Sequence, residues 1–282
     1  MTNDRGDGRS SSGNCVHLAP ASSSRAQRVD EGGRAVDHQL GAVPEDWQRM
    51  LAVVAHPDDL EYGAASAVAR WTTAGKWVGY VVVTNGEAGI DGVPPDEAGP
   101  IRMAEQEHSA QIVGVDDVRF LGYPDGVVEP SAALRRDVAR EIRRSQPDVL
   151  LIATYDLTYG LSPGQRIVNQ ADHRAVGIAT LDAARDAANR WIFPELLDDG
   201  FEPWPGVRHV YVMGSNEPTH AVDVTDTLAA GVESLQAHRA YLDGLGRDFD
   251  PAEFLQGMTI GAGCALGVRN AVAFGRVQLQ GV

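Results

Sequence analysis

Cysteine is nearly absent from this sequence of 282 residues, which contains only Cys15 and Cys264. The two are far apart and neither belongs to a C-x-x-C pair, so the sequence predicts neither a disulfide scaffold nor a thiolate metal site. Lysine is rarer still, because Lys76 is the only one. Long apolar runs are also missing, since none approaches the roughly 18 residues that span a bilayer. The chain is nevertheless long enough to bury a substantial core.

Positive charge is in deficit. The sequence has 24 Lys and Arg against 39 Asp and Glu, which gives a formal net charge of -15. Such a balance repels nucleic acid phosphates and anionic lipid surfaces, so we expect no nucleic acid partner and no membrane span. The first 30 residues lack the uninterrupted apolar core of a signal peptide, and a cytoplasmic location is therefore the expectation.

The chain consists of two regions that differ in composition and in their apolar pattern. Residues 1–44 are rich in Ser, Gly, Arg and Asp without a sustained apolar period, which predicts a flexible N-terminal tail. In residues 45–282 apolar runs alternate with helical patterns, which predicts a single α/β domain, Rossmann-like, with a mostly parallel sheet flanked by helices on both faces. Strands are expected at 50–55, 77–84, 118–121, 149–153, 207–213 and 221–224; helices are expected at 63–74, 102–113, 131–144 and from about 172.

The segment His56-Pro57-Asp58-Asp59 falls where the first predicted strand ends. In open parallel sheets, sites form at the carboxyl ends of the strands. An imidazole from His56 and a carboxylate from Asp59 are ordinary zinc ligands, and Pro57 restricts the loop that presents them. Asp58 would remain free. The alternative is a structural one, in which the same four residues form a turn followed by a helix cap.

A catalytic zinc site has three protein ligands and a water, so a third ligand is needed elsewhere in the chain. His173 is the leading candidate because it also follows a buried strand, at the start of a predicted helix. Asp172 beside it could orient an imidazole by accepting a hydrogen bond. Iron uses comparable nitrogen and oxygen ligands, so the sequence predicts Zn²⁺ and leaves Fe²⁺ as the alternative.

Further motifs follow in order: AHPDDLE at 55–61, TNGEAG at 84–89, Arg102 with Glu105, FLGYPDG at 120–126 and DH at 172–173. Together these resemble the PIG-L / LmbE-like superfamily of zinc-dependent de-N-acetylases, which remove acetyl groups from N-acetylglucosamine-type sugars. The resemblance spans residues 50 to about 190. It implies a small amino-sugar conjugate as the substrate and leaves open whether copies of the chain form a homo-oligomer.

The resemblance also implies roles for individual residues. Zinc would be held by His56, Asp59 and His173, and Asp58 would be the general base. Arg102 and Asp125 match positions that contact the sugar or aglycone in related enzymes. The structural alternatives are that Arg102 is an ion-pair partner on a helix face and that Asp125 is a turn residue.

One position departs from the family pattern. In the motif that ends at His173, many members have His-Pro-Asp-His, whereas this chain has Gln170 at the position of the first histidine. A glutamine amide can donate a hydrogen bond to an oxyanion but cannot supply a proton. We therefore expect another acid, with His220 as the first candidate and His238 as the second, although either could be a structural histidine.

Three functions are compatible with these residues. The first is removal of an N-acetyl group from an N-acetylglucosamine-type conjugate, by metal-activated water with Asp58 as the base and Gln170 or His220 stabilising the oxyanion. The second is hydrolysis of a larger N-acyl amide on such a sugar. The third is a sugar-binding protein without turnover, against which the presence of Asp58 argues.

Overall fold

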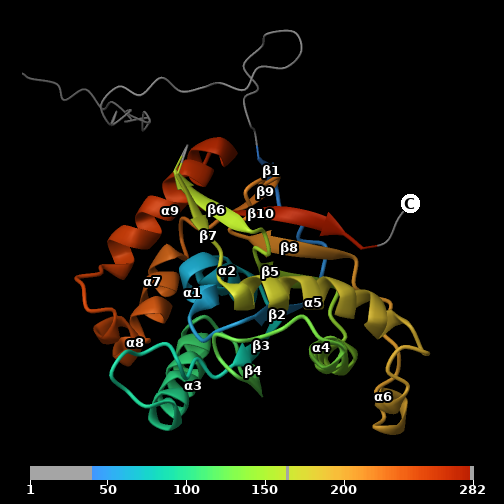
Figure 1. The fold of residues 1–282 in the computed structure, drawn as a ribbon. Coiled ribbons are helices and arrows are strands. Elements are labelled where there is room, and N and C mark those ends of the chain that lie inside the picture. Colours follow the sequence, from blue (N-terminus) through green and yellow to red (C-terminus); the bar gives the residue numbers. More distant parts are fainter. Residues whose placement is uncertain (1–39, 163–164, 280–282) are drawn as a thin grey trace, which may run out of the picture. The chain divides into compact units, whose positions relative to one another are not determined.

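An eight-stranded sheet is the central layer in the computed structural model, which describes residues 40–162 and 165–279 (Figure 1). The strands are β1 (Gly41–Ala42), β2 (Arg49–Val54), β3 (Trp77–Thr84), β4 (Asp117–Tyr123), β5 (Val149–Ala153), β6 (Thr158–Ser162), β7 (Gln165–Val168), β8 (His209–Met213), β9 (His220–Asp223) and β10 (Ala271–Gln278). The sheet order is β1-β9-β10-β8-β5-β2-β3-β4, and β6 pairs with β7 in a separate hairpin. Only β10, among these sheet strands, runs antiparallel to its neighbours. The predicted α/β fold with a mostly parallel sheet is confirmed.

Helices cover both faces of the sheet (Figure 1). They are α1 (Asp59–Gly63), α2 (Ala65–Thr73), α3 (Pro95–Ile112), α4 (Ala132–Ser145), α5 (Ala171–Ala188), α6 (Glu195–Asp198), α7 (Leu228–Gln236), α8 (Arg239–Gly244) and α9 (Pro251–Leu266). Helices α4 and α5 pack together on one face, whereas α1, α2, α3 and α7 lie on the other.

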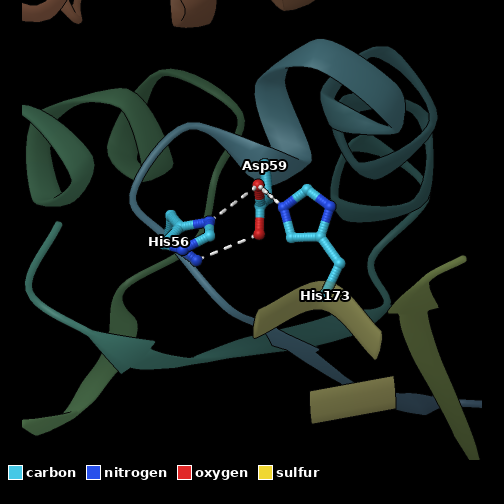
Figure 2. A group of neighbouring side chains, drawn as sticks. All are labelled: His56, Asp59 and His173. Carbon is cyan, nitrogen blue, oxygen red and sulfur yellow. Dashed lines mark hydrogen bonds and ion pairs between the residues drawn. The ribbon is translucent and has the colours of Figure 1, made fainter. Parts of the chain in front are cut away.

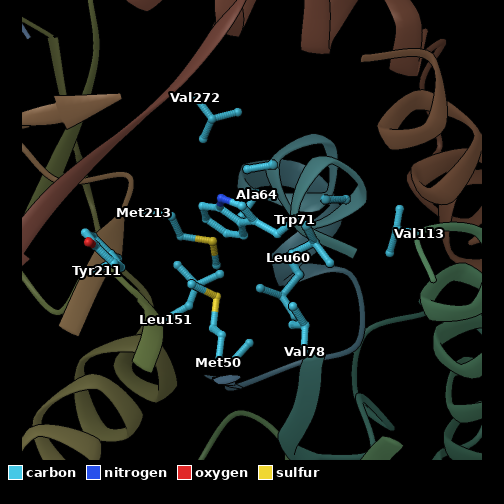
Figure 3. Packing of buried hydrophobic residues seen from close by; sticks show 14 of the residues in the cluster. Met50, Leu60, Ala64, Trp71, Val78, Val113, Leu151, Tyr211, Met213 and Val272 are labelled. Atoms are coloured by element: carbon cyan, nitrogen blue, oxygen red, sulfur yellow. The ribbon is translucent and has the colours of Figure 1, made fainter. Parts of the chain in front are cut away.

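Alternate residues of β2 belong to different cores, because successive side chains of a strand point to opposite faces. Met50, Ala52 and Val54 pack in the cluster that includes Trp71 of α2, part of which Figure 3 shows. Leu51 and Val53 pack against α4 and α5. Burial on both faces explains why this strand is a continuous apolar run, and it fixes the end of β2 rigidly beneath the first motif.

Several predicted elements match, with local differences that have clear causes. The predicted strands at 77–84 and 149–153 coincide with β3 and β5. Ser131 caps α4, the helix expected at 131–144, since its hydroxyl accepts a hydrogen bond from the Leu134 N–H at 3.2 Å. The helix expected at 63–74 is α2, which begins at Ala65 because Ala64 leaves the helical conformation at φ -142°; the short helix α1 before it was not predicted.

Two segments hold structure that the sequence did not predict. The segment between the predicted strand at 149–153 and the predicted helix from about 172 contains the β6–β7 hairpin. The Gly- and Ala-rich C-terminal segment forms α9, capped by the Asp250 carboxylate, and then β10, which inserts between β8 and β9.

The predicted tail over 1–44 lies outside the described residues except at its end. There Gly41 and Ala42 pair with β9 and Val43 is buried, so the described domain includes these residues. Among the helices of the described ranges, none combines the length and apolar character needed to cross a bilayer.

Candidate metal centre and active site

Three side chains converge at the carboxyl ends of the central strands. His56 and Asp59 follow β2, and His173 lies in the first turn of α5, which follows β5 and the β6–β7 hairpin (Figure 2). Asp59 Oδ1 lies 3.0 Å from His173 Nε2 and 3.6 Å from His56 Nδ1. The ligand atoms of a tetrahedral zinc site are about 3.3–3.5 Å apart, so this spacing fits a single ion.

Asn169 sets the protonation of His173. The Asn169 amide N–H groups donate to the carbonyls of Thr154 at 2.7 Å and Asp156 at 3.0 Å, which turns the amide oxygen toward His173 Nδ1 at 3.0 Å. His173 Nδ1 therefore carries the hydrogen, and the lone pair is on Nε2. That lone pair faces a carboxylate oxygen of Asp59, and two acceptors at this distance require a cation or proton between them.

Hydrogen bonds to neighbouring side chains also orient His56. Its Nε2 lies 3.1 Å from Asp125 Oδ1 and 3.2 Å from Asp172 Oδ2, so it donates to these carboxylates and leaves Nδ1 free. Asp172 is itself fixed by the N–H groups of Gly126 at 2.7 Å and Val128 at 3.0 Å. Hydrogen-bonded carboxylates of this kind hold a histidine ligand in one tautomer.

The centre carries negative charge that favours a cation. Burial alone would lower the pKa of His56, but the charge of Asp59 and the hydrogen bonds to Asp125 and Asp172 raise it to about 12. Burial would raise the pKa of Asp59, yet His173 and His56 hold it well below its usual value. The two imidazoles and one carboxylate therefore fit Zn²⁺ or Fe²⁺ in chemistry, spacing and charge.

Asp58 stands beside this centre in a strained conformation. Its φ of 99° is a left-handed value that costs a non-glycine residue about 1–3 kcal/mol. Its N–H donates to Gln106 Oε1 at 2.8 Å, and its carboxylate meets the Arg102 guanidinium at 3.0 Å. Burial raises the pKa of Asp58 to about 6, against the opposing charge of Arg102. A buried carboxylate with a pKa in this range is suited to accept a proton from water.

Arg102 lies inside the protein rather than at its surface. It is 2% exposed and donates to the Gly86 carbonyl at 3.1 Å and to the Pro57 carbonyl. A Cβ on Gly86 would come within 2.5 Å of the guanidinium, and a Cβ on Gly89 would overlap it. The two glycines of the TNGEAG segment therefore make room for Arg102, which contacts Asp58.

Asp125 is likewise engaged within the protein. Oδ1 contacts His56, and Oδ2 accepts the Ala88 N–H at 2.9 Å. Its own N–H donates to Glu87 at 2.9 Å, so the loops after β3 and β4 are tied together. These contacts place Asp125 where it orients His56, and the expected sugar contact of Asp125 stays a prediction.

The structure does not bring His220 to the centre. It begins β9, which is separated from β2 by β10, β8 and β5. Four strand spacings of about 4.8 Å amount to about 19 Å, which exceeds the reach of the side chain. Its imidazole contacts Thr219 Oγ1 at 2.8 Å instead.

The other two candidates for the acid occupy different places. His238 is fully buried with Nε2 3.6 Å from Glu61 Oε2, and Glu61 also accepts from Gln106 and Ser109. Gln170 precedes α5 and is exposed, and within the described residues its side chain makes no capping hydrogen bond to the helix. Its amide is therefore free to donate to a bound molecule.

Three contributors were not predicted. Glu61 lies inside the AHPDDLE motif, and Asn169 directly precedes Gln170 and the start of α5, so both are polar residues at or beside a recognised motif. Tyr241 of α8, whose ring lies 4.3 Å from Arg102 Cζ, had no such signal.

The chain is similar to known proteins in sequence and in fold. The family model described as "PIG-L: GlcNAc-PI de-N-acetylase" matches residues 51–184. The chain is 25% identical over 207 residues to a diacetylchitobiose deacetylase of Thermococcus kodakarensis, covering 73% of this chain and 74% of that protein. It is 28% identical over 276 residues to a 1D-myo-inositol 2-acetamido-2-deoxy-alpha-D-glucopyranoside deacetylase of Kineococcus radiotolerans, covering 76% and 75%. The fold is similar to that of N,N'-diacetylchitobiose deacetylase from Pyrococcus horikoshii, with a TM-score of 0.72 at 24% identity over 83% of this chain and 85% of that one.

Proposed function

This chain belongs to the PIG-L / LmbE-like family of GlcNAc-conjugate de-N-acetylases, and from that premise we propose that it is a metal-dependent hydrolase of an N-acetylglucosamine-type conjugate, with Asp58 as its general base. The observation that carries the proposal is the convergence of three ligand atoms beside an unliganded buried carboxylate. His56, Asp59 and His173 would hold the ion. The relatives named above act on sugars with an acetamido group, which supports this substrate class.

The proposed reaction is amide hydrolysis. A bound zinc ion would supply Lewis-acid polarisation of the acetamide carbonyl and would acidify a water molecule. Asp58 accepts the proton of that water as its oxygen adds to the carbonyl carbon. The same proton passes from Asp58 to the nitrogen when the carbon–nitrogen bond breaks, so the products are acetate and a free amino sugar.

Gln170 is proposed to donate a hydrogen bond to the tetrahedral oxyanion. Its free amide at the start of α5 supports this role, because His173 comes from the same helical turn. Removing one donor of this kind typically lowers turnover by on the order of 100-fold or more. The return of the proton by Asp58 makes a histidine acid unnecessary, which is consistent with the distance of His220.

The test begins with the metal. Protein loaded with Zn²⁺ or Fe²⁺ and freed of excess ion should hold one ion per chain, measured by elemental analysis. Acetate release is then measured with diacetylchitobiose and with an N-acetylglucosaminyl inositol as substrates. Wild-type protein should release acetate while Asp58→Asn should keep the ion and release almost none.

Two results would contradict the proposal. Full metal loading without acetate from either substrate in wild type would favour a sugar-binding protein. Release of a larger acid from an N-acyl analogue, with no acetate from the acetyl compounds, would favour the amidase.

A further inference from the structure

We propose that Tyr241 is a positioning residue for the catalytic base, holding Arg102 where it fixes the Asp58 carboxylate; this inference rests on the function proposed above. Tyr241 belongs to α8, outside residues 51–184 that match the family model. Its ring covers the guanidinium at 4.3 Å from Cζ, and the guanidinium meets Asp58 at 3.0 Å. Tyr241 is thereby linked, through Arg102, to the Asp58 carboxylate that accepts the proton of water in the proposed reaction.

The buried guanidinium needs such a partner. Arg102 is 2% exposed, and its Nε has no hydrogen-bond partner within the described part of the chain. A charged group in this environment is stabilised by the electron-rich face of an aromatic ring more strongly than it would be in water. Gly86 and Gly89 crowd the same guanidinium. Its position, and through it that of the Asp58 carboxylate, therefore depends on the ring from α8.

Helix α8 is itself held firmly. The Ala240 N–H donates to Glu105 Oε1 of α3 at 2.6 Å. At the other end, a Cβ on Gly244 would approach Ile90 to within 2.9 Å, so the helix lies closely against the loop after β3. These contacts join α8 to the two segments that carry Arg102 and its glycines. These contacts therefore hold the helix that carries Tyr241 in place.

The Tyr241 hydroxyl is influenced by the charge of the same carboxylate. Burial, together with the charge of Asp58, raises the pKa of Tyr241 above its usual value, so the hydroxyl remains protonated. The ring and the hydroxyl can be separated by substitution, since Tyr241→Phe keeps the first and removes the second.

The matched control is another arginine–aromatic pair. Arg49 lies over the Trp77 ring with Cζ 3.9 Å from its centre, at the amino ends of β2 and β3 and therefore at the edge of the sheet opposite the metal centre. Trp77→Leu removes a contact of the same kind without touching the loops that carry the site.

The experiment compares Tyr241→Leu, Tyr241→Phe and Trp77→Leu with wild type, using metal content, thermal unfolding, kcat and KM for acetate release. We expect one zinc ion per chain in all of them. Tyr241→Leu should lower kcat roughly 10- to 100-fold with KM changed less than about twofold, because a displaced base leaves substrate binding intact. Tyr241→Phe should retain at least about a third of kcat, and Trp77→Leu should retain wild-type kcat. Tyr241→Met, which keeps volume but lacks the ring, replaces the leucine variant if that variant fails to fold.

Several results would overturn the inference. Wild-type kcat in Tyr241→Leu would do so, as would a raised KM at unchanged kcat, which is the signature of a substrate contact. Loss of zinc from Tyr241→Leu, or an equal loss of kcat in Trp77→Leu, would assign the effect to general disruption. These failures leave the proposed function standing if wild type releases acetate, whereas an inactive wild type overturns both.

Discussion

Replacement of Asn169 by alanine should weaken zinc binding without unfolding the protein. Asn169 is 1% exposed, and its amide makes three hydrogen bonds, to His173, Thr154 and Asp156. Without the amide oxygen, His173 Nδ1 loses the acceptor that keeps the lone pair on Nε2. Loss of such an outer partner typically lowers metal affinity 10- to 100-fold, which corresponds to about 1.4–2.7 kcal/mol.

Weaker zinc binding in Asn169→Ala could also result from a less stable fold, and a control variant with a similar loss of stability separates the two explanations. Three lost hydrogen bonds at about 1 kcal/mol each reduce the free energy of unfolding by about 3 kcal/mol. Asn216→Ala is the matched control, because the Asn216 amide donates to Asp156 Oδ2 at 2.8 Å and to the Thr158 carbonyl at 2.7 Å but does not touch His173. This control should lose about 2 kcal/mol and keep wild-type zinc affinity.

The assay is competition for zinc against a chelator of known affinity, with urea unfolding of the metal-free proteins alongside. An unchanged zinc dissociation constant in Asn169→Ala would refute the reasoning about the His173 tautomer. Equal weakening in Asn169→Ala and Asn216→Ala would show that loosening of the shared loop is responsible.

Four further predictions concern the same site. His173→Ala should lose zinc by elemental analysis yet keep its circular dichroism spectrum, because catalytic ions in large α/β domains seldom supply the folding energy; full metal content would remove His173 from the ligand set. The base must be deprotonated, so kcat/KM should decline as pH falls below about 6, the pKa of Asp58. The positive charge of a bound metal ion would lower this pKa and so move the acid side of the pH profile to lower pH. A decline that begins at pH 8 would require another base. Gly89→Ala, whose Cβ would overlap Arg102, should lower kcat at least 10-fold with zinc retained, while Gly257→Ala, with nothing within 4 Å of its Cβ, should leave kcat unchanged. His220→Ala should retain wild-type turnover while Gln170→Ala loses most of it, and the reverse order in acetate release would bring His220 back into the mechanism.

The sequence predicted the central sheet because its strands are buried on both faces. Valine-rich runs such as residues 77–84 can be read without tertiary information, and the motifs that follow them locate the edge where side chains converge. The convergence of His56, Asp59 and His173 follows from that topology, since β5 is the direct neighbour of β2.

The partners that orient these residues could not be predicted in the same way. Arg102 is one example, because an arginine on a helix is usually exposed, whereas here Gly86 and Gly89 approach the guanidinium closely and the Tyr241 ring covers it. His220 is another: its place depends on β10, a strand from the far end of the sequence that separates β9 from β8. Such contacts join different elements of the chain and leave no local periodicity.

The position of β10 has a consequence for synthesis of the protein. This strand is the last along the described chain, yet it occupies the third place in the sheet and provides hydrogen-bonding partners for β8 on one side and β9 on the other. Until residue 278 has left the ribosome, both neighbours present open edges that can pair with another nascent chain. We therefore expect the half of the sheet that bears the metal centre to form early, and closure of the other half to await the synthesis of residues 271–278.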